Sequence, residues 1–147
     1  MNVFLAGIIQ GSIVRKKIHD QDWREAIKAV LARRLPGAEV YCHFARHPNS
    51  IAYDLRRLRA TLAEGNRLAA ACDLLVAYVP SASMGTAVEM YEAARGGAAV
   101  LTISPLRANW VVRAYSDRVF ADLATFEAYL QTPAFQRLVA RKAKRRP

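Results

Sequence analysis

Short apolar runs alternate with longer amphipathic segments along the chain. The apolar runs are NVFLAG (2–7), AEVYCH (38–43), DLLVAYV (73–79), AAVLTI (98–103) and a shorter RVF (118–120). Apolar runs of this length between turn residues are typical of buried strands. DLLVAYV is apolar almost throughout, which favours a central strand of a parallel sheet that is covered on both faces.

The segments between these runs repeat their apolar residues at helical spacing. Residues Trp23, Ala26, Ile27, Val30, Leu31 and Leu35 form one such stripe. This stripe predicts an amphipathic helix, which Pro36-Gly37 ends. Further helices are expected over 51–71, 85–95 and 122–131, with a helical turn within 103–117.

Strands that alternate with helices indicate parallel βαβ units. We therefore predict an α/β fold, a three-layer, flavodoxin- or Rossmann-like open parallel sheet of about five strands with helices on both faces. Residues 1–132 are assigned to one domain, and 133–147 to a basic C-terminal tail that is helical and then frayed. Such sheets bind ligands beyond the carboxyl ends of their strands. The loops 7–12, 43–50, 80–85 and 104–110 follow those ends.

The chain carries 22 Lys and Arg against 12 Asp and Glu, a net charge of +10. Part of this excess lies in the tail, at Arg137, Arg141, Lys142, Lys144, Arg145 and Arg146. Such a field attracts nucleotides, acidic partners or nucleic acid. Because no RNA-recognition, zinc-finger or helix-turn-helix pattern is present, nucleic-acid binding is not the favoured interpretation.

Membrane and redox features point to a cytoplasmic protein. The apolar runs are far shorter than the roughly 20 residues that span a bilayer. The N-terminus lacks the basic start of a signal peptide. Cys42 and Cys72 both adjoin expected strands, which favours two buried thiols over a disulfide.

Several familiar sites are excluded. No P-loop, GxGxxG or GxSxG pattern occurs in the chain. His43 and His47 are four residues apart, but we expect them in a strand and loop, and no HExxH motif is present. The sequence therefore predicts neither a metal site nor a cofactor.

The stretch SASMGTAVEM (81–90) contains a single acid, Glu89, and allows two interpretations. Thr86 to Glu89 reads Thr-x-x-Glu, a capping box in which the glutamate folds back onto the start of its helix. Alternatively, the stretch follows the central strand at the ligand-binding edge, where a carboxylate can act on a substrate.

The region around Glu89 resembles the nucleoside 2-deoxyribosyltransferase superfamily, which includes the 2′-deoxynucleoside 5′-phosphate N-hydrolases. The resemblance lies in Asp73, the strand LLVAYV, Ser83, Gly85 and Glu89 in that register, together with the opening FLAG. It covers residues 2–10 and 70–130.

This resemblance implies cleavage of the N-glycosidic bond of a (deoxy)nucleoside or nucleoside 5′-monophosphate, with hydrolysis or transfer to another base. Glu89 would be the nucleophile of a retaining mechanism. In a first helical turn it would be kept ionised near neutral pH. Gly85 would let the loop backbone approach the sugar, and Ser83 would bind a 5′-phosphate or 5′-hydroxyl. Gly7, in the first glycine turn, would also bind the substrate.

The chain departs from the family pattern at two places. Ile8, Ile9 and Gln10 follow the first glycine where the phosphate-using branch has a serine and an arginine. We expect Ser12, Arg15, Lys16 or Lys17 to take over that role. Gly65 stands where the family has an aspartate, and Glu64 or Asn66 is expected to substitute for it.

In the family, a neighbouring subunit often completes the site from the segment after the fourth strand. Here that segment suggests Asn109 for a substrate contact and Trp110 for base stacking or an interface, unless Trp110 is a core residue. A homo-oligomer is therefore expected. The alternative function is a non-catalytic nucleotide-sensing or protein-interaction domain on the same fold.

Overall fold

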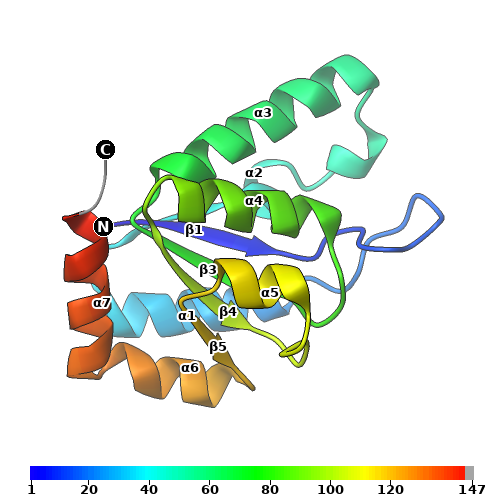
Figure 1. The fold of residues 1–147 in the computed structure, drawn as a ribbon. Helices are drawn as coiled ribbons and strands as arrows, with labels where there is room; N and C mark the ends of the chain where they lie inside the picture. Colours follow the sequence, from blue (N-terminus) through cyan, green and yellow to red (C-terminus); the bar gives the residue numbers. More distant parts are fainter. Residues whose placement is uncertain (145–147) are drawn as a thin grey trace.

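The computed structural model describes residues 1–144 and contains a single five-stranded sheet (Figure 1). Its strands are β1 (Asn2–Gly7), β2 (Glu39–Cys42), β3 (Leu74–Tyr78), β4 (Ala99–Ile103) and β5 (Arg118–Phe120). They are all parallel and lie in the order β2-β1-β3-β4-β5. The five predicted strands are confirmed.

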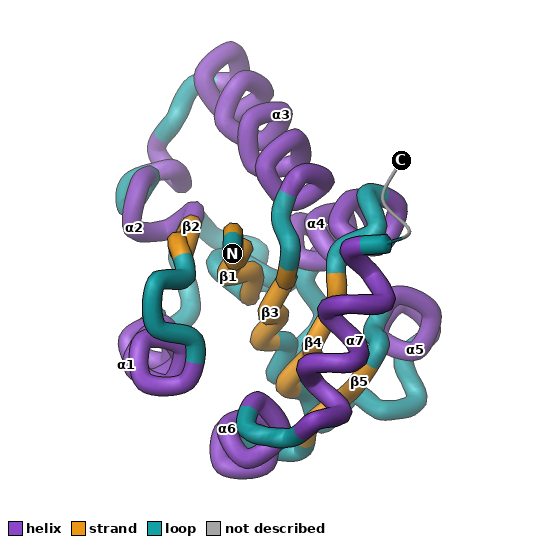
Figure 2. The backbone as a smooth tube through the Cα atoms, turned by 90° about the vertical axis from the view of Figure 1, so that its left-hand side faces the viewer, coloured by secondary structure: helices purple, strands orange, loops and turns teal. Residues whose placement is uncertain are grey.

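Helices cover both faces of the sheet (Figures 1 and 2). One face carries α3 (Leu55–Ala71), α4 (Met84–Arg95) and α5 (Trp110–Tyr115), and the other carries α1 (Trp23–Arg34), α6 (Leu123–Leu130) and α7 (Pro133–Ala143). The predicted three-layer α/β fold is confirmed.

Residues 43–50 differ from the loop that the sequence suggested. A one-turn helix, α2 (His43–Arg46), begins directly at the end of β2, and a short 3-10 turn, η1 (Ser50–Ala52), follows. His43 and His47 therefore lie at the two ends of one helical turn, with ring centroids 5.0 Å apart.

Each central strand packs on both of its faces because successive side chains point in opposite directions. In β1, Val3 and Leu5 join the core under α1, α6 and α7, whereas Phe4 and Ala6 join the core under α3, α4 and α5. This two-sided burial explains why the strands read as continuous apolar runs.

The beginning of the basic tail belongs to the folded body. Phe135 and Leu138 of α7 are buried in the same core as α6, and Lys142 pairs with Asp117 at 2.9 Å. The last three residues of the expected frayed tail, 145–147, lie outside the described residues.

Cys42 and Cys72 are buried thiols that form no disulfide, as predicted. In the part of the chain that the structure describes, no helix has both the length and the apolar composition that a bilayer crossing requires.

The end of β1 is tightly packed at Gly7. A Cβ atom at this position would collide with the Trp23 ring and lie 2.9 Å from the Tyr78 carbonyl oxygen. Trp23 is held in place by stacking on Tyr78, with ring centroids 4.6 Å apart. Gly7 is therefore required by packing, whatever its relation to a substrate.

We predict that Gly7→Ala destabilises the fold by about 1–3 kcal/mol, because the methyl group displaces the indole or the β3 backbone. Gly85→Ala is the matched control, since a Cβ atom there meets nothing within 4 Å. Urea denaturation of both variants tests this. Equal stability of Gly7→Ala and the wild type would contradict the packing argument.

Candidate active site

A pocket of about 310 Å³ opens beyond the carboxyl ends of β1 and β3. The strand order changes direction between these two strands, so this is the place where parallel sheets bind ligands. The wall is formed by the loop after β1, by α2, η1 and α3, and by the start of α4. The lining includes Gly7, Ser83, Gly85 and Glu89, four of the residues singled out in the sequence.

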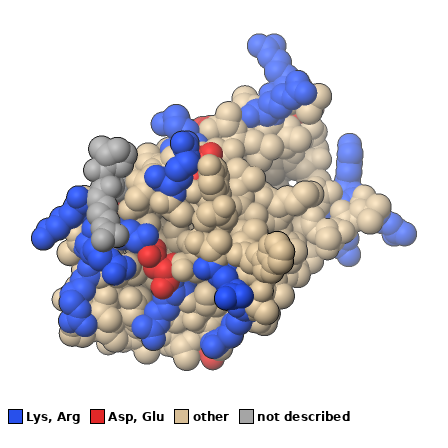
Figure 3. Space-filling view, viewed as in Figure 1, with Lys and Arg blue, Asp and Glu red and all other residues tan. Residues whose placement is uncertain are grey.

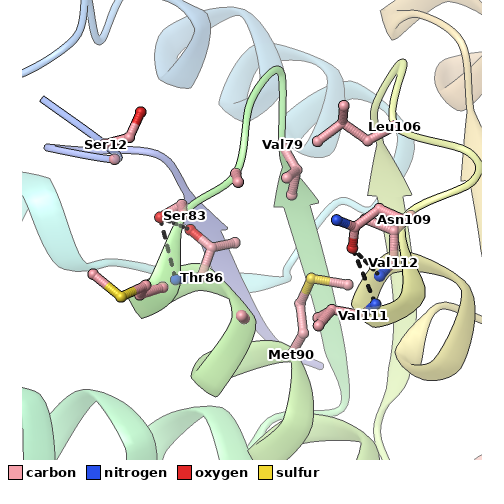
Figure 4. A pocket seen from close by; sticks show the side chains of 13 residues that line it. Ser12, Val79, Ser83, Thr86, Met90, Leu106, Asn109, Val111 and Val112 are labelled. Carbon is pink, nitrogen blue, oxygen red and sulfur yellow. Dashed lines mark hydrogen bonds between the residues drawn. The ribbon is translucent and has the colours of Figure 1, made fainter.

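Glu89 lies in the second turn of α4 and does not cap the helix. The N-cap is Ser83, whose Oγ accepts hydrogen bonds from the Thr86 backbone N–H at 3.5 Å and the Thr86 hydroxyl at 3.0 Å (Figure 4). Because the N-cap lies three residues before Thr86, a Thr86–Glu89 capping box does not form. The capping interpretation is wrong, and the Glu89 carboxylate is left facing the pocket.

Burial raises the pKa of the Glu89 carboxyl to about 8, against a smaller opposing effect of the Arg24 charge. The expectation that the helix start keeps this group ionised near neutral pH is therefore wrong for the free protein. Its carboxyl sits beyond the first turn, where the helix dipole has largely faded, so the loss of solvation dominates.

Arg24 supplies the positive charge near Glu89 and is itself only 2% exposed. Its guanidinium donates to the carbonyls of Leu5 at 3.4 Å and Gly7 at 3.2 Å, and to the side-chain oxygen of Gln21 at 2.7 Å. It thus joins α1 to the end of β1 directly behind the pocket.

Ser12 and Asn109 line an adjoining pocket of about 330 Å³, shown in Figure 4. Ser83 and Thr86 line both pockets, so the start of α4 separates them. The side chain of Asn109 caps α5, where its oxygen accepts from the backbone N–H groups of Val111 at 3.0 Å and Val112 at 3.2 Å. These two bonds engage the side-chain oxygen of Asn109, the residue expected to contact a substrate.

Glu64 and Asn66 are not among the residues that line the Glu89 pocket. Gly65 between them is buried, and a Cβ atom there would lie 3.4 Å from Nδ1 of His43. α3 instead reaches the pocket with Leu58 and Leu62. That Glu64 or Asn66 substitutes for an aspartate at position 65 stays a prediction.

Trp110 is 85% exposed, so the alternative that it belongs to the core is wrong. Glu92, one turn after Glu89, forms an ion pair with Arg95 at 3.2 Å.

Sequence reasoning missed Arg24 and His43. Arg24 shares the buried face of α1 with Ile27 and Leu31, and this spacing of three and four residues was the available signal. His43 directly follows a strand at the ligand-binding edge, and that position was the available signal. Within residues 1–144, no group of three or more His, Cys, Asp or Glu is placed to hold a metal ion.

Basic side chains form several separate groups on the face drawn in Figure 3, where little acidic surface is visible. This distribution gives a general positive field that favours anionic ligands.

Solved structures of similar fold were compared with the chain. A 2-deoxyribosyltransferase from the psychrotolerant bacterium Bacillus psychrosaccharolyticus superposes with a TM-score of 0.64 at 16% identity, covering 88% of this chain and 96% of that one. The chain has the fold of this deoxyribosyltransferase. A conserved protein from Enterococcus faecalis V583 has a TM-score of 0.60 at 16% identity, covering 89% and 97% of the two chains.

The CMP N-glycosidase BcmB of Clostridium botulinum has a TM-score of 0.52 at 17% identity, covering 88% of this chain and 97% of that one. No protein-family model matches the sequence, and no curated protein matches it. At these identities, the likeness concerns the fold. It agrees with the fold that the sequence resemblance implied.

We predict that Glu89→Gln stabilises the fold in a pH-dependent way. Between about pH 4.5 and pH 8, the Glu89 carboxyl ionises in the unfolded chain but stays protonated in the folded one, so wild-type stability falls as pH rises through this window. The melting temperature of Glu89→Gln relative to the wild type should be higher at pH 8.5 than at pH 5, by roughly 3 °C or more.

Glu92→Gln is the control for this measurement, since its carboxylate has a partner on the surface. Titration of His43 occurs in both proteins and cancels in the comparison. A pH-independent difference between Glu89→Gln and the wild type would mean that the Glu89 carboxyl is not desolvated.

Proposed function

We propose that the chain is an N-glycosidase of the nucleoside 2-deoxyribosyltransferase type, acting on a (deoxy)nucleoside or nucleoside 5′-monophosphate through Glu89. The observation that carries the proposal is the position of this carboxylate, desolvated and without a structural hydrogen bond among residues 1–144, in a pocket at the switch between β1 and β3.

The lining of the pocket suits a nucleophilic carboxylate. Among residues 1–144, Glu89 is the one carboxyl group that lines this pocket. In a retaining reaction such a group attacks the sugar directly. Its oxygen bonds to C1′ as the C1′–N bond breaks, and the bonding electrons leave with the base, which takes up a proton.

The second step regenerates the carboxylate. Water, or the nitrogen of a second base, bonds to C1′ while the ester bond to Glu89 breaks, and the incoming group loses a proton. Two inversions give overall retention at C1′. Hydrolysis and transfer differ only in the acceptor that reaches this intermediate.

The start of α4 is suited to the 5′ end of such a substrate. Ser83 offers a hydroxyl at a helix N-terminus, where backbone N–H groups favour negative charge. Gly85 leaves open space beside it. The adjoining pocket with Ser12 would give a 5′-phosphate room, and the positive surface would attract it.

The names of the similar structures agree with this chemistry. One is a 2-deoxyribosyltransferase and another a CMP N-glycosidase, and both act on an N-glycosidic bond by name. The alternative, a nucleotide-sensing domain, uses the same pocket without bond cleavage.

Incubation with a panel of nucleosides and 5′-monophosphates tests the proposal, with free base measured by chromatography. We expect base release by the wild type and by Glu92→Gln, and a loss of at least about 1,000-fold in Glu89→Gln, because the nucleophile is absent. Equal release by Glu89→Gln and the wild type would refute the assignment. Ligand-dependent stabilisation without base release would favour the sensing domain.

The pH profile of kcat/KM gives a second prediction. Because the free enzyme must lose the Glu89 proton before attack, kcat/KM should rise about tenfold per pH unit below pH 7 and level off above the pKa of about 8. An activity that is flat from pH 6 to pH 9 would contradict the role of a desolvated carboxylate.

We also propose self-association through the face formed by α4 and α5. This face exposes Met84, Val88 and Tyr91 at helical spacing on α4, together with Trp110 on α5. Exposed apolar groups of this size on neighbouring helices are typical of interfaces. Sedimentation should show a dimer or larger oligomer that Trp110→Ser weakens by at least about tenfold. A wild-type monomer at micromolar concentration would refute this.

A further inference from the structure

His43 lies in the Glu89 pocket with an unusual arrangement of its ring nitrogens. The side chain is 8% exposed and lines the pocket at the carboxyl end of β2. Its Nδ1 is sealed from solvent and has no hydrogen-bond partner. Nε2 also makes no hydrogen bond within residues 1–144 and is not sealed from solvent. Because His43 lines the pocket, we assign the free side of Nε2 to it.

The place of Nδ1 is set by Gly65 of α3. A Cβ atom at Gly65 would be in van der Waals contact with Nδ1, at 3.4 Å. The ring thus packs flush against a helix whose own N–H and C=O groups are bonded along α3. A side chain longer than alanine at this position would compete with the imidazole for space.

This packing decides which nitrogen carries the proton. A buried N–H without an acceptor is rarer and costs more than an under-used acceptor atom. A neutral imidazole at this position therefore keeps its proton on Nε2 and leaves Nδ1 bare. Burial, together with the charges of His47 and Arg24, lowers the pKa of His43 to about 4, so the ring is neutral near pH 7.

The geometry of a nucleoside indicates what an Nε2–H donor would meet. The base and the attacking carboxylate lie on opposite faces of the sugar ring, because attack at C1′ is in line with the departing base. The 2′- and 3′-hydroxyls of a ribonucleoside lie on the face away from the base, which is the face of the nucleophile. A donor in the pocket of Glu89 is therefore on the side of these hydroxyls.

We propose that His43 is a specificity-determining residue that donates a hydrogen bond from Nε2 to the 2′- or 3′-hydroxyl of the substrate pentose. This inference rests on the proposed function for the class of substrate. It adds a residue and an atom that select the sugar. A donor that has no partner in the free protein would reject a sugar that lacks the hydroxyl, because its partner is then missing in a closed pocket.

Binding to four cytidine 5′-monophosphates that differ in their hydroxyls tests the proposal: the ribo, 2′-deoxy, 3′-deoxy and 2′,3′-dideoxy compounds. Calorimetry is carried out in the Glu89→Gln background, which prevents turnover, with and without His43→Leu. With His43 present, we expect at least one hydroxyl-bearing compound to bind about tenfold or more tightly than the dideoxy compound. With His43→Leu, this ratio should fall below about threefold.

Two further variants separate recognition from structure. His43→Asn keeps a donor and should retain part of the hydroxyl preference. His47→Leu changes the neighbouring ring, which bonds to the hydroxyl of Tyr53 at 3.2 Å and does not line the pocket, so the preference should be unchanged. An equal loss of affinity for all four compounds in His43→Leu, together with a lower melting temperature, would show a structural role and overturn the proposal.

The tautomer has its own measurement. Nitrogen-15 NMR of the free protein near pH 7 should show His43 neutral with its proton on Nε2, and a proton on Nδ1 would overturn the proposal. Failure of the proposed function looks different. Absence of base release by the wild type, with a hydroxyl preference that His43→Leu abolishes, would refute the enzyme and keep this inference. Base release by the wild type, with a hydroxyl preference that is unchanged in His43→Leu, would keep the enzyme and refute the role of His43.

Discussion

The hydrogen bonds of the buried Arg24 guanidinium hold the site together. They reach the backbone carbonyls of Leu5 and Gly7 at the end of β1 and the side chain of Gln21 before α1. A buried cation is tolerated only when its donors are satisfied, so these groups fix one another. The loop after β1 starts from this junction, and the same charge acts on Glu89. The position of the pocket wall and the charge near Glu89 thus both depend on the side chain of Arg24.

Two effects act in opposite directions on the pKa of Glu89: desolvation raises it, and the positive charge of Arg24 lowers it. Desolvation prevails, which leaves the carboxyl with a pKa of about 8. The Glu89 carboxyl must lose its proton before it attacks, and its pKa lies near the working pH. The weakly solvated carboxylate that results is a stronger nucleophile than a solvated one. His43 is perturbed in the opposite direction, so the pocket contains a carboxyl and an imidazole that are both largely neutral at pH 7. A substrate would meet little fixed charge near its sugar.

The sequence predicted the layers of the fold because each strand carries its own periodic signal. It predicted that Gly7, Ser83, Gly85 and Glu89 share an edge, since the carboxyl ends of neighbouring strands meet there. It could not predict the exact start of α4. Ser83 and Thr86 both fit the N-cap, and a shift of three residues moved Glu89 from the first turn to the second. The burial of Glu89 and the pairing of His43 with Gly65 arise from α2 and α3, which are distant in sequence from α4.

The proposed mechanism requires a covalent bond between C1′ of the sugar and Glu89. A 2′-fluoro-arabinosyl nucleoside tests this directly, because the fluorine slows hydrolysis of the glycosyl-enzyme and lets it accumulate. After acid quenching and digestion, mass spectrometry should find the fluorosugar on the peptide that holds residues 85–95, with fragmentation placing it on Glu89 and none in Glu89→Gln. Base release from this substrate with no sugar on the protein, or with the sugar on another residue, would contradict the account.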